Sequence, residues 1–138
     1  MFDQSPTEQL FPFCEKENIA IIARVPFDEG SLTGMITPDT RFEKDDWREK
    51  YFNGDRKVDV QKRVEKLRKL LASEAQTLPE LALRYVLSFP TVSTVMPGMR
   101  RTAHVKENIC VSDGRVLSNA LLDELKAHRW ERNFYTGI

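Results

Sequence analysis

Residues 19–34 read IAIIARVPFDEGSLTG, and this stretch decides the fold. It begins with a nearly continuous apolar run of strand length, Ile19–Val25. A run without alternation between apolar and polar residues is typical of a parallel strand that is covered on both faces. Pro26, Gly30 and Gly34 follow, and residues of these types break regular structure and predict a loop. The stretch therefore indicates an α/β fold with a loop at the carboxyl end of a strand.

A second strand is expected at Val92–Met96, which is rich in β-branched residues and stops at Pro97-Gly98. Helices are expected around the strands, at about residues 5–18, 56–74, 77–89, 102–110 and 118–130. This order of elements favours parallel strands joined by crossovers. Met1–Gln4 is a candidate for the tail of a third strand, so the sequence predicts two to three parallel strands with several helices.

Two of these helices begin with a capping box, in which a hydroxyl residue is followed three positions later by a glutamate. Ser5 and Thr77 are the expected N-caps. Pro12 is expected to bend the first helix, because proline removes an internal hydrogen bond. In the helix at about 56–74, a 4-3-4 spacing of apolar residues predicts one buried stripe. The stripe consists of Val60, Val64, Leu67 and Leu71.

The chain has 138 residues and a mass of 16.0 kDa, which is the size of one domain. Its 21 Lys and Arg balance 21 Asp and Glu, so neither nucleic acid nor an anionic membrane is an expected partner. No apolar run approaches the roughly 20 residues that span a bilayer. The first residues also lack the basic start and apolar stretch of a signal peptide. We therefore expect a cytoplasmic protein.

Two further features bear on its chemistry. Cys14 and Cys110 are far apart and show no C-x-x-C spacing, so we interpret them as reduced core thiols rather than a disulfide. Residues 41–70 are dense in charges of both signs. A solvated loop and an exposed helix face are the preferred interpretation of this segment, and a polyanion-binding site is the alternative.

The strongest functional signal follows the second strand, in Met96–Asn108. Gly98 lets the backbone turn, Arg100 and Arg101 follow, and a helix begins at about Thr102. Parallel α/β sheets bind ligands beyond the carboxyl ends of their strands. Unpaired N–H groups at the start of a helix attract an anion, and guanidinium groups add charge and a planar fork of donors. These residues indicate a phosphate or carboxylate site, with arginines solvated in a loop as the alternative.

Three segments together resemble the aldo-keto reductases. Phe2–Pro6 resembles the end of that barrel's sixth strand and the start of the next helix. Ile19–Gly34 is similar to the seventh strand and its phosphate-binding loop, A-x-x-P-L-x-x-G-x-L-T-G. Thr94–Asn108 resembles the eighth strand and its G-x-x-x-x-x-Q-x-x-E-N turn. The resemblance covers residues 1–138 as a single segment, from the sixth strand to the C-terminal helix, and implies the C-terminal part of a (β/α)8 TIM barrel, an incomplete barrel.

The resemblance also implies a site for NADP(H). The loop after the seventh strand would close over the pyrophosphate of this nicotinamide cofactor. The turn after the eighth strand would meet the adenine and the adenosine 2′-phosphate, where positive charge favours NADP(H) over NAD(H). The implied cofactor-binding residues are Pro26, Phe27, Gly30, Leu32, Gly34, Gly98, Met99, Arg100, Arg101, His104, Glu107 and Asn108.

Three positions depart from the family pattern. His104 stands where glutamine is usual, and outside the motif it would be interpreted as a solvated side chain. Met35 replaces a lysine that often follows L-T-G, and Val25 replaces a frequent serine. The last two departures each remove a candidate phosphate contact.

Members of this family reduce carbonyls with NADPH, using a tyrosine as general acid with an aspartate, a lysine and a histidine. All four lie in the first half of the barrel, so no catalytic residue is assigned here. Tyr51, Tyr85, Tyr135 and His128 have no strand-end Asp and Lys placed to tune them. No metal cluster, P-loop or nucleophile elbow is present in the sequence either.

The resemblance therefore implies the cofactor-binding C-terminal portion of an NADP(H)-dependent aldo-keto reductase, which we expect not to turn over substrate by itself. The alternative is a non-catalytic dinucleotide-binding or assembly module. Such a module would cover its exposed strand edges by forming a homo-oligomer or by docking on an N-terminal half-barrel.

Overall fold

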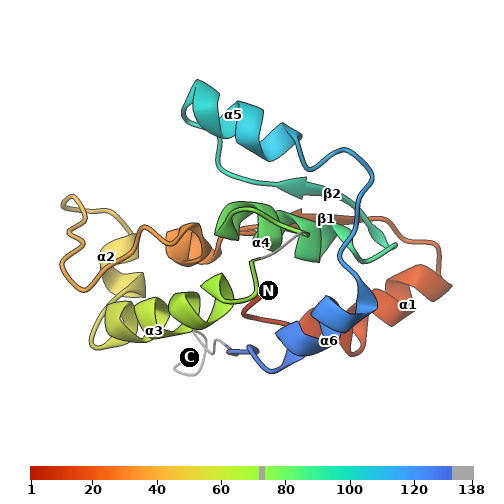
Figure 1. Ribbon diagram of the computed structural model, residues 1–138, viewed down its shortest axis with the longest axis horizontal. Helices are drawn as coiled ribbons and strands as arrows, with labels where there is room; N and C mark the ends of the chain where they lie inside the picture. The colour runs from red at the N-terminus through yellow and green to blue at the C-terminus, as the bar shows by residue number, and fades with distance from the viewer. Residues whose placement is uncertain (72–73, 132–138) are drawn as a thin grey trace.

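The computed structural model describes residues 1–71 and 74–131. Figure 1 shows two short strands with α4 alongside them, α5 above, and α3 and α6 below. The elements in chain order are η1 (Ser5–Thr7), α1 (Leu10–Lys16), β1 (Ile21–Arg24), η2 (Asp28–Thr33), α2 (Arg48–Tyr51), α3 (Arg56–Arg68), α4 (Leu78–Leu87), β2 (Val92–Met96), α5 (Thr102–Ile109) and α6 (Asn119–Lys126). The α/β class predicted from the sequence is confirmed.

The sheet of the described residues consists of β1 and β2, which pair in parallel. Ile22 pairs with Thr94 and Arg24 with Met96, so the two strands end side by side. Met1–Gln4 forms no strand, although the sequence made it a candidate. This segment is nonetheless fixed in the core, because the Gln4 side-chain amide donates to the Leu125 carbonyl at 2.8 Å.

One face of the sheet is bare. The strand β1 alternates between half-buried and exposed residues, and Ile22 is 62% exposed. On β2, Met96 is 57% exposed. The expectation that the first strand is covered on both faces is therefore wrong for the described residues. Helix α4 covers one face, and the face that carries Ile22, Arg24 and Met96 is the one that points inward in a closed barrel. Its bareness identifies the fold as an incomplete barrel.

The first helix differs from its prediction. Ser5 does not cap it; its hydroxyl donates to the Asp3 carboxylate at 2.6 Å, and Ser5–Thr7 forms a separate 3₁₀ turn. The helix α1 then begins at Leu10, so Pro12 lies in its first turn. Backbone N–H groups in a first turn have no partner within the helix, so proline breaks no hydrogen bond there.

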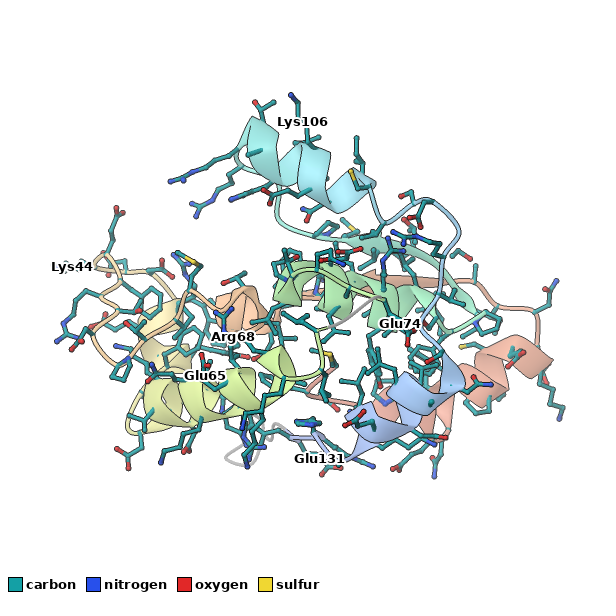
Figure 2. All side chains as sticks on the ribbon, in the orientation of Figure 1. Lys44, Glu65, Arg68, Glu74, Lys106 and Glu131 are labelled. Atoms are coloured by element: carbon teal, nitrogen blue, oxygen red, sulfur yellow. The ribbon has the colours of Figure 1, made fainter. Side chains whose placement is uncertain are left out.

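Two later helices, α4 and α6, begin at the N-caps that the sequence predicts. Thr77 caps α4 by accepting from the Glu80 N–H at 3.2 Å, as the capping box predicts. Ser118 caps α6 by accepting from the Leu121 N–H, and the Ser118 N–H donates to Glu74 at 2.6 Å (Figure 2). Two helices are shorter than expected: α3 ends at residue 68 and α6 at residue 126. The stripe on α3 is buried at Val60, Val64 and Leu67, and Leu71 is half-buried.

Most residues of the charged segment 41–70 are exposed, as the preferred interpretation expects, but the segment also carries two aromatic anchors. Tyr51 and Phe52 are each only 2% exposed and belong to the main core. Phe42 stacks on Phe52 with ring centroids 5.3 Å apart, and the Arg48 guanidinium lies over the Phe42 ring. Aromatic packing thus holds this segment to the domain.

The structure also corrects the expectation for one cysteine, because Cys110 is exposed rather than in the core.

A buried arginine joins α4 to the connection before α6. The Arg84 side chain is 1% exposed and donates to both carboxylate oxygens of Asp113 at 2.9 Å. It also donates to Glu80 at 2.8 Å and to the Arg115 carbonyl at 3.0 Å. All three guanidinium nitrogens thus donate to an acceptor, which compensates the burial of the charge. None of the helices in residues 1–71 and 74–131 is long and apolar enough to cross a membrane.

Candidate functional site

The loop after β1 has an unusual backbone. Val25, Asp28 and Glu29 have φ values of 53°, 53° and 55°, and Gly30 follows at 104°. Positive φ is uncommon outside glycine and is strained for a β-branched residue such as Val25. Strained backbone of this kind is concentrated at functional sites and persists where the surroundings hold it in place. The loop is therefore a candidate ligand-binding element.

Three hydrogen bonds help to hold this loop in shape. The Phe27 carbonyl accepts from the N–H groups of both Gly30 and Leu32 at 3.0 Å. The Tyr51 hydroxyl, from α2, donates to the Asp28 carboxylate at 2.7 Å. The charged segment thus anchors the loop through a phenol.

The far end of the loop is closed by Gly34, whose φ is 75°. The Arg68 guanidinium donates to the Gly34 carbonyl at 3.2 Å, and Figure 2 shows Arg68 on α3. A Cβ atom at this position would lie 2.4 Å from Arg68 Nη2 and 2.9 Å from Leu78 Cδ1. Only glycine fits, both in conformation and in space.

The second loop follows β2 and leads into α5. Gly98, Met99, Arg100 and Arg101 are all exposed there. Asn108 is buried, and its side-chain amide donates to the Gly98 carbonyl at 3.3 Å. This bond ties the turn back onto α5. Arg100 and Arg101 directly precede the start of α5, whose first N–H groups can attract an anion.

The charges of the site are distributed unevenly. Among residues 1–71 and 74–131, three arginines form no hydrogen bond, ion pair or ring contact: Arg24, Arg100 and Arg101. All three lie at or just beyond the carboxyl ends of the paired strands. Each of the other described arginines has such a partner. The arginines without such a partner in this part of the chain therefore lie where a parallel sheet binds its ligands.

Residues of the charged segment extend toward these strand ends. Arg48 donates to Asp46 through Nε at 3.0 Å, and this bond lowers the pKa of Asp46 to about 2, with a smaller contribution from the charge of Arg100. The pKa of Arg48 is raised, chiefly by the hydrogen bond to Asp46 and further by the charge of Glu29. The Asp46–Arg48 pair therefore lies within electrostatic range of both loops.

A cavity of about 680 Å³ opens beside the end of β1. Its lining includes Arg24, Val25, Glu29, Trp47 and Tyr51, together with apolar residues of α1 and α4. Trp47 is 51% exposed and packs on Tyr51 with ring centroids 5.3 Å apart. The cavity offers an apolar wall and a few charged groups, the usual composition of a small-molecule site.

The residues expected to bind a cofactor divide into three groups in the structure. Those with exposed side chains are Met99, Arg100, Arg101, His104 and Glu107, on the second loop and α5. Pro26, Leu32 and Asn108 are buried, so their side chains shape the loops from within. Phe27, Gly30 and Gly34 are half-buried in the first loop, and Gly98 is exposed in the second.

Three residues of the site were not found by reasoning from the sequence. Arg24 is a charged residue in an otherwise apolar strand, and this break in the pattern could have marked it as a site residue. Trp47 and Tyr51 are four positions apart within the charged segment, a spacing that places two side chains on one face of a helix. Because the residues around them are mostly charged, this short aromatic pattern does not stand out in the sequence.

No general acid emerges from the candidates considered in the sequence. Tyr51 is buried, and its hydroxyl donates a hydrogen bond to the Asp28 carboxylate. Burial raises the pKa of Tyr85 to about 12, and burial also lowers the pKa of His128. Tyr135 lies outside the described residues. No group of three or more His, Cys, Asp or Glu side chains in the described part of the chain could hold a metal ion.

Comparison with known proteins decides the family. The model of the aldo/keto reductase family matches residues 1–129. The chain belongs to the aldo/keto reductase family. The resemblance inferred from three segments is therefore confirmed. Aldo-keto reductases use nicotinamide cofactors.

Two curated relatives of this aldo-keto reductase chain are similar over most of its length. The NADH-specific methylglyoxal reductase of Escherichia coli is 26% identical over 109 residues, covering 79% of this chain and 33% of its own. The uncharacterized oxidoreductase YqkF of Bacillus subtilis is 25% identical over 128 residues, covering 93% of this chain and 40% of its own. The chain thus spans between a third and two fifths of these relatives.

Solved structures confirm the barrel fold. The glycerol dehydrogenase AKR11B4 from Gluconobacter oxydans superposes with a TM-score of 0.76 at 24% identity, covering 99% of this chain and 43% of that one. The holo form of the aldo-keto reductase AKR11C1 from Bacillus halodurans gives a TM-score of 0.67 at 21% identity, covering 97% of this chain and 41% of that one. This aldo-keto reductase chain therefore has the fold of part of such a barrel.

Proposed function

We propose that this chain supplies the NADP(H)-binding portion of an oxidoreductase that transfers hydride between the cofactor and a carbonyl or alcohol. The observation that carries the proposal is the set of three unpaired arginines at the carboxyl ends of β1 and β2. A dinucleotide phosphate is an anion with charge at its pyrophosphate and at its adenosine end. The two loops described above are its proposed binding elements, and the cytoplasm is its proposed location.

The choice of NADP(H) over NAD(H) rests on Arg100 and Arg101. Both are exposed, and the N-terminus of α5 begins directly after them. A phosphate held by a helix N-terminus and two guanidinium groups receives charge-assisted hydrogen bonds. One similar enzyme is named for NADH, so family membership alone does not decide this choice.

The double variant Arg100→Ala/Arg101→Ala tests it. We expect the variant to weaken NADPH binding about tenfold, corresponding to about 1.4 kcal/mol, and NADH binding much less, because only NADPH carries the 2′-phosphate. Fluorescence titration of the purified chain with each cofactor measures both affinities. Lys106→Ala is the matched control, because Lys106 is exposed and extends outward from α5 (Figure 2). Equal losses for the two cofactors would show that the arginines do not contact the 2′-phosphate.

A second prediction concerns turnover. The 138-residue chain alone should not consume NADPH in the presence of aldehydes or ketones, because neither Tyr51, which is bonded to Asp28, nor the buried Tyr85 is suited to act as a general acid. The measurement is the loss of NADPH absorbance with a panel of carbonyl compounds. Steady consumption that scales with the concentration of the pure chain would contradict this part of the proposal.

The second candidate function is a dinucleotide-binding or assembly module without its own chemistry. The bare face of β1 and β2, with Ile22 and Met96 more than half exposed, favours it. Apolar strands with unpaired edges invite association, with a second copy or with an N-terminal half-barrel. Size-exclusion chromatography with light scattering tests this reading, and a monomer at micromolar concentration would count against self-association.

A further inference from the structure

The chain just after α6 is fixed between the N-terminal segment and α3. Figure 1 shows this part of the chain returning from α6 toward α3. The Trp130 backbone N–H donates to the Phe2 carbonyl at 2.9 Å, and the two rings pack edge to face with centroids 5.5 Å apart. The guanidinium groups of Arg56 and Arg63, both on α3, each lie 4.2 Å from the centroid of the Trp130 ring. The indole is therefore held by one aromatic ring and two cations.

Arg56 has a second aromatic partner. Its guanidinium also lies 4.9 Å from the centroid of the Tyr51 ring, so it links α2 to the indole of Trp130. The Arg56 side chain is half-buried at the first position of α3. Burial lowers the pKa of Arg56, and the nearby charge of Asp28 opposes this effect. A cation on an aromatic face is held more strongly when it is withdrawn from water, so Arg56 is a firm link between the two rings.

Tyr51 continues this link to the loop after β1. Its hydroxyl donates to the Asp28 carboxylate at 2.7 Å, and Asp28 has a φ of 53°. A positive φ is unfavourable for a residue with a side chain and persists where the surroundings hold it. Tyr51 is 2% exposed, so the position of its ring depends on the side chains packed against it, including Arg56. A connected set of contacts thus reaches from Trp130 through Arg56 and Tyr51 to this loop.

We propose that Arg56 is a positioning residue that couples the chain at Trp130 to the loop after β1, by holding Tyr51 in place. With its ring held, the Tyr51 hydroxyl stays bonded to Asp28 and the loop keeps its shape. Displacement of Trp130 releases Arg56 and loosens the loop, so the chain after α6 controls a binding element more than 90 positions away in the sequence. The consequence for cofactor affinity rests on the proposed function, whereas the coupling itself needs no bound cofactor.

The first test measures hydrogen exchange of backbone amides in the full 138-residue chain without cofactor. The readout is the amides of Gly30 and Leu32, which both donate to the Phe27 carbonyl, and the amides of α4 are the reference for global opening. Arg56→Met should accelerate exchange at these two loop amides about tenfold, as for the loss of a partly desolvated cation–π contact, and leave α4 unchanged. Arg56→Lys should recover part of the loss, because it keeps a cation near the rings.

Arg63→Met is the matched control, because Arg63 lies at the same distance from the Trp130 ring but about two turns further along α3. It should leave the loop amides unchanged. In a Tyr51→Phe background, Arg56→Met should add no further acceleration, because the bond through which it acts is already absent. Unchanged loop exchange in Arg56→Met would overturn the coupling, as would an equal effect of Arg63→Met or an equal acceleration in α4.

The second measurement is NADPH affinity by fluorescence titration. Arg56→Met is expected to weaken NADPH binding about threefold, because the fraction of molecules with an ordered loop is reduced, and Arg63→Met should leave it unchanged. Accelerated loop exchange with an unchanged NADPH affinity would overturn the control of binding by the chain after α6. If the unaltered chain binds no NADPH, the proposed function fails, and the exchange rates decide the coupling separately.

Discussion

Replacing Arg84 with methionine is expected to lower the free energy of unfolding by about 3 kcal/mol, within the range seen when one partner of a buried ion pair is removed. The guanidinium is 1% exposed and fills its site with bonds to Asp113, Glu80 and the Arg115 carbonyl. Methionine has a similar length but leaves these acceptors without their donor. The two carboxylates keep 33% and 21% exposure, so water compensates them in part. Thermal denaturation should show a decrease in Tm of about 10 °C.

Arg115→Ala is the control, because the Arg115 side chain is 63% exposed although it also bonds Asp113. Its loss should stay below about 1 kcal/mol, as for other exposed ion pairs. A similar loss for both variants would show that burial of Arg84 is not what makes its network important.

The same network predicts a dependence on pH. Hydrogen bonds from Arg84, and then from Arg115, hold the pKa of Asp113 well below its usual range. A carboxyl group whose pKa is lower in the folded state contributes stability at pH values above its unfolded pKa, which is about 4. That contribution is lost as the pH falls below this value. The unaltered chain should therefore lose more stability than Arg84→Met between pH 5 and pH 3, measured by urea denaturation.

Gly34→Ala is expected to destabilise the chain by about 2–4 kcal/mol, combining about 1–2 kcal/mol for a left-handed alanine with about 1–3 kcal/mol for overpacking. The new Cβ would lie 2.9 Å from Leu78 Cδ1, and Leu78 is buried in the core and cannot move aside. It would also displace the Arg68 guanidinium from the Gly34 carbonyl. The measurement is the free energy of unfolding in urea, together with NADPH affinity, since the loop that we propose to bind the cofactor ends at this residue.

The chain provides a matched control in Gly54. Its φ is 55°, and a Cβ there would meet nothing within 4 Å. Gly54→Ala should therefore lower the free energy of unfolding only by the cost of a left-handed alanine, about 1–2 kcal/mol. The difference between the unfolding free energies of the two variants measures the clash at Gly34. Equal free energies would show that the side chains around residue 34 move aside without loss of stability.

Much of the architecture could be predicted because the signals were local. The caps at Thr77 and Ser118 and the β-branched strand at Val92–Met96 depend on side chains within a few residues of one another. The first helix was misread because Ser5 has a nearer partner in Asp3 than the helix N-terminus. Nothing in the spacing of residues reports such a competition.

The site was predictable only in part. Its glycines and the arginines at 100 and 101 stand in a recognisable order, whereas Tyr51 reaches Asp28 across 23 positions of sequence. The buried state of Tyr51 and Phe52 depends on aromatic packing within a segment whose composition is that of a solvated loop. The bare face of β1 could not be read from the apolar run, because such a run describes a strand in a complete sheet.

The parallel pairing of β1 and β2 has a consequence for folding. Ile21 and Val92 are 71 positions apart in the sequence, so the sheet forms by closing a long loop, at an entropic cost that increases with loop length. The helices α3 and α4 lie within that loop and are built from contacts between near neighbours, which form faster than distant ones. We therefore expect the helices to assemble before the strands align. The paired strand ends that place Arg24 beside Met96 then become the last part of the molecule to order and the first to open when the fold is destabilised.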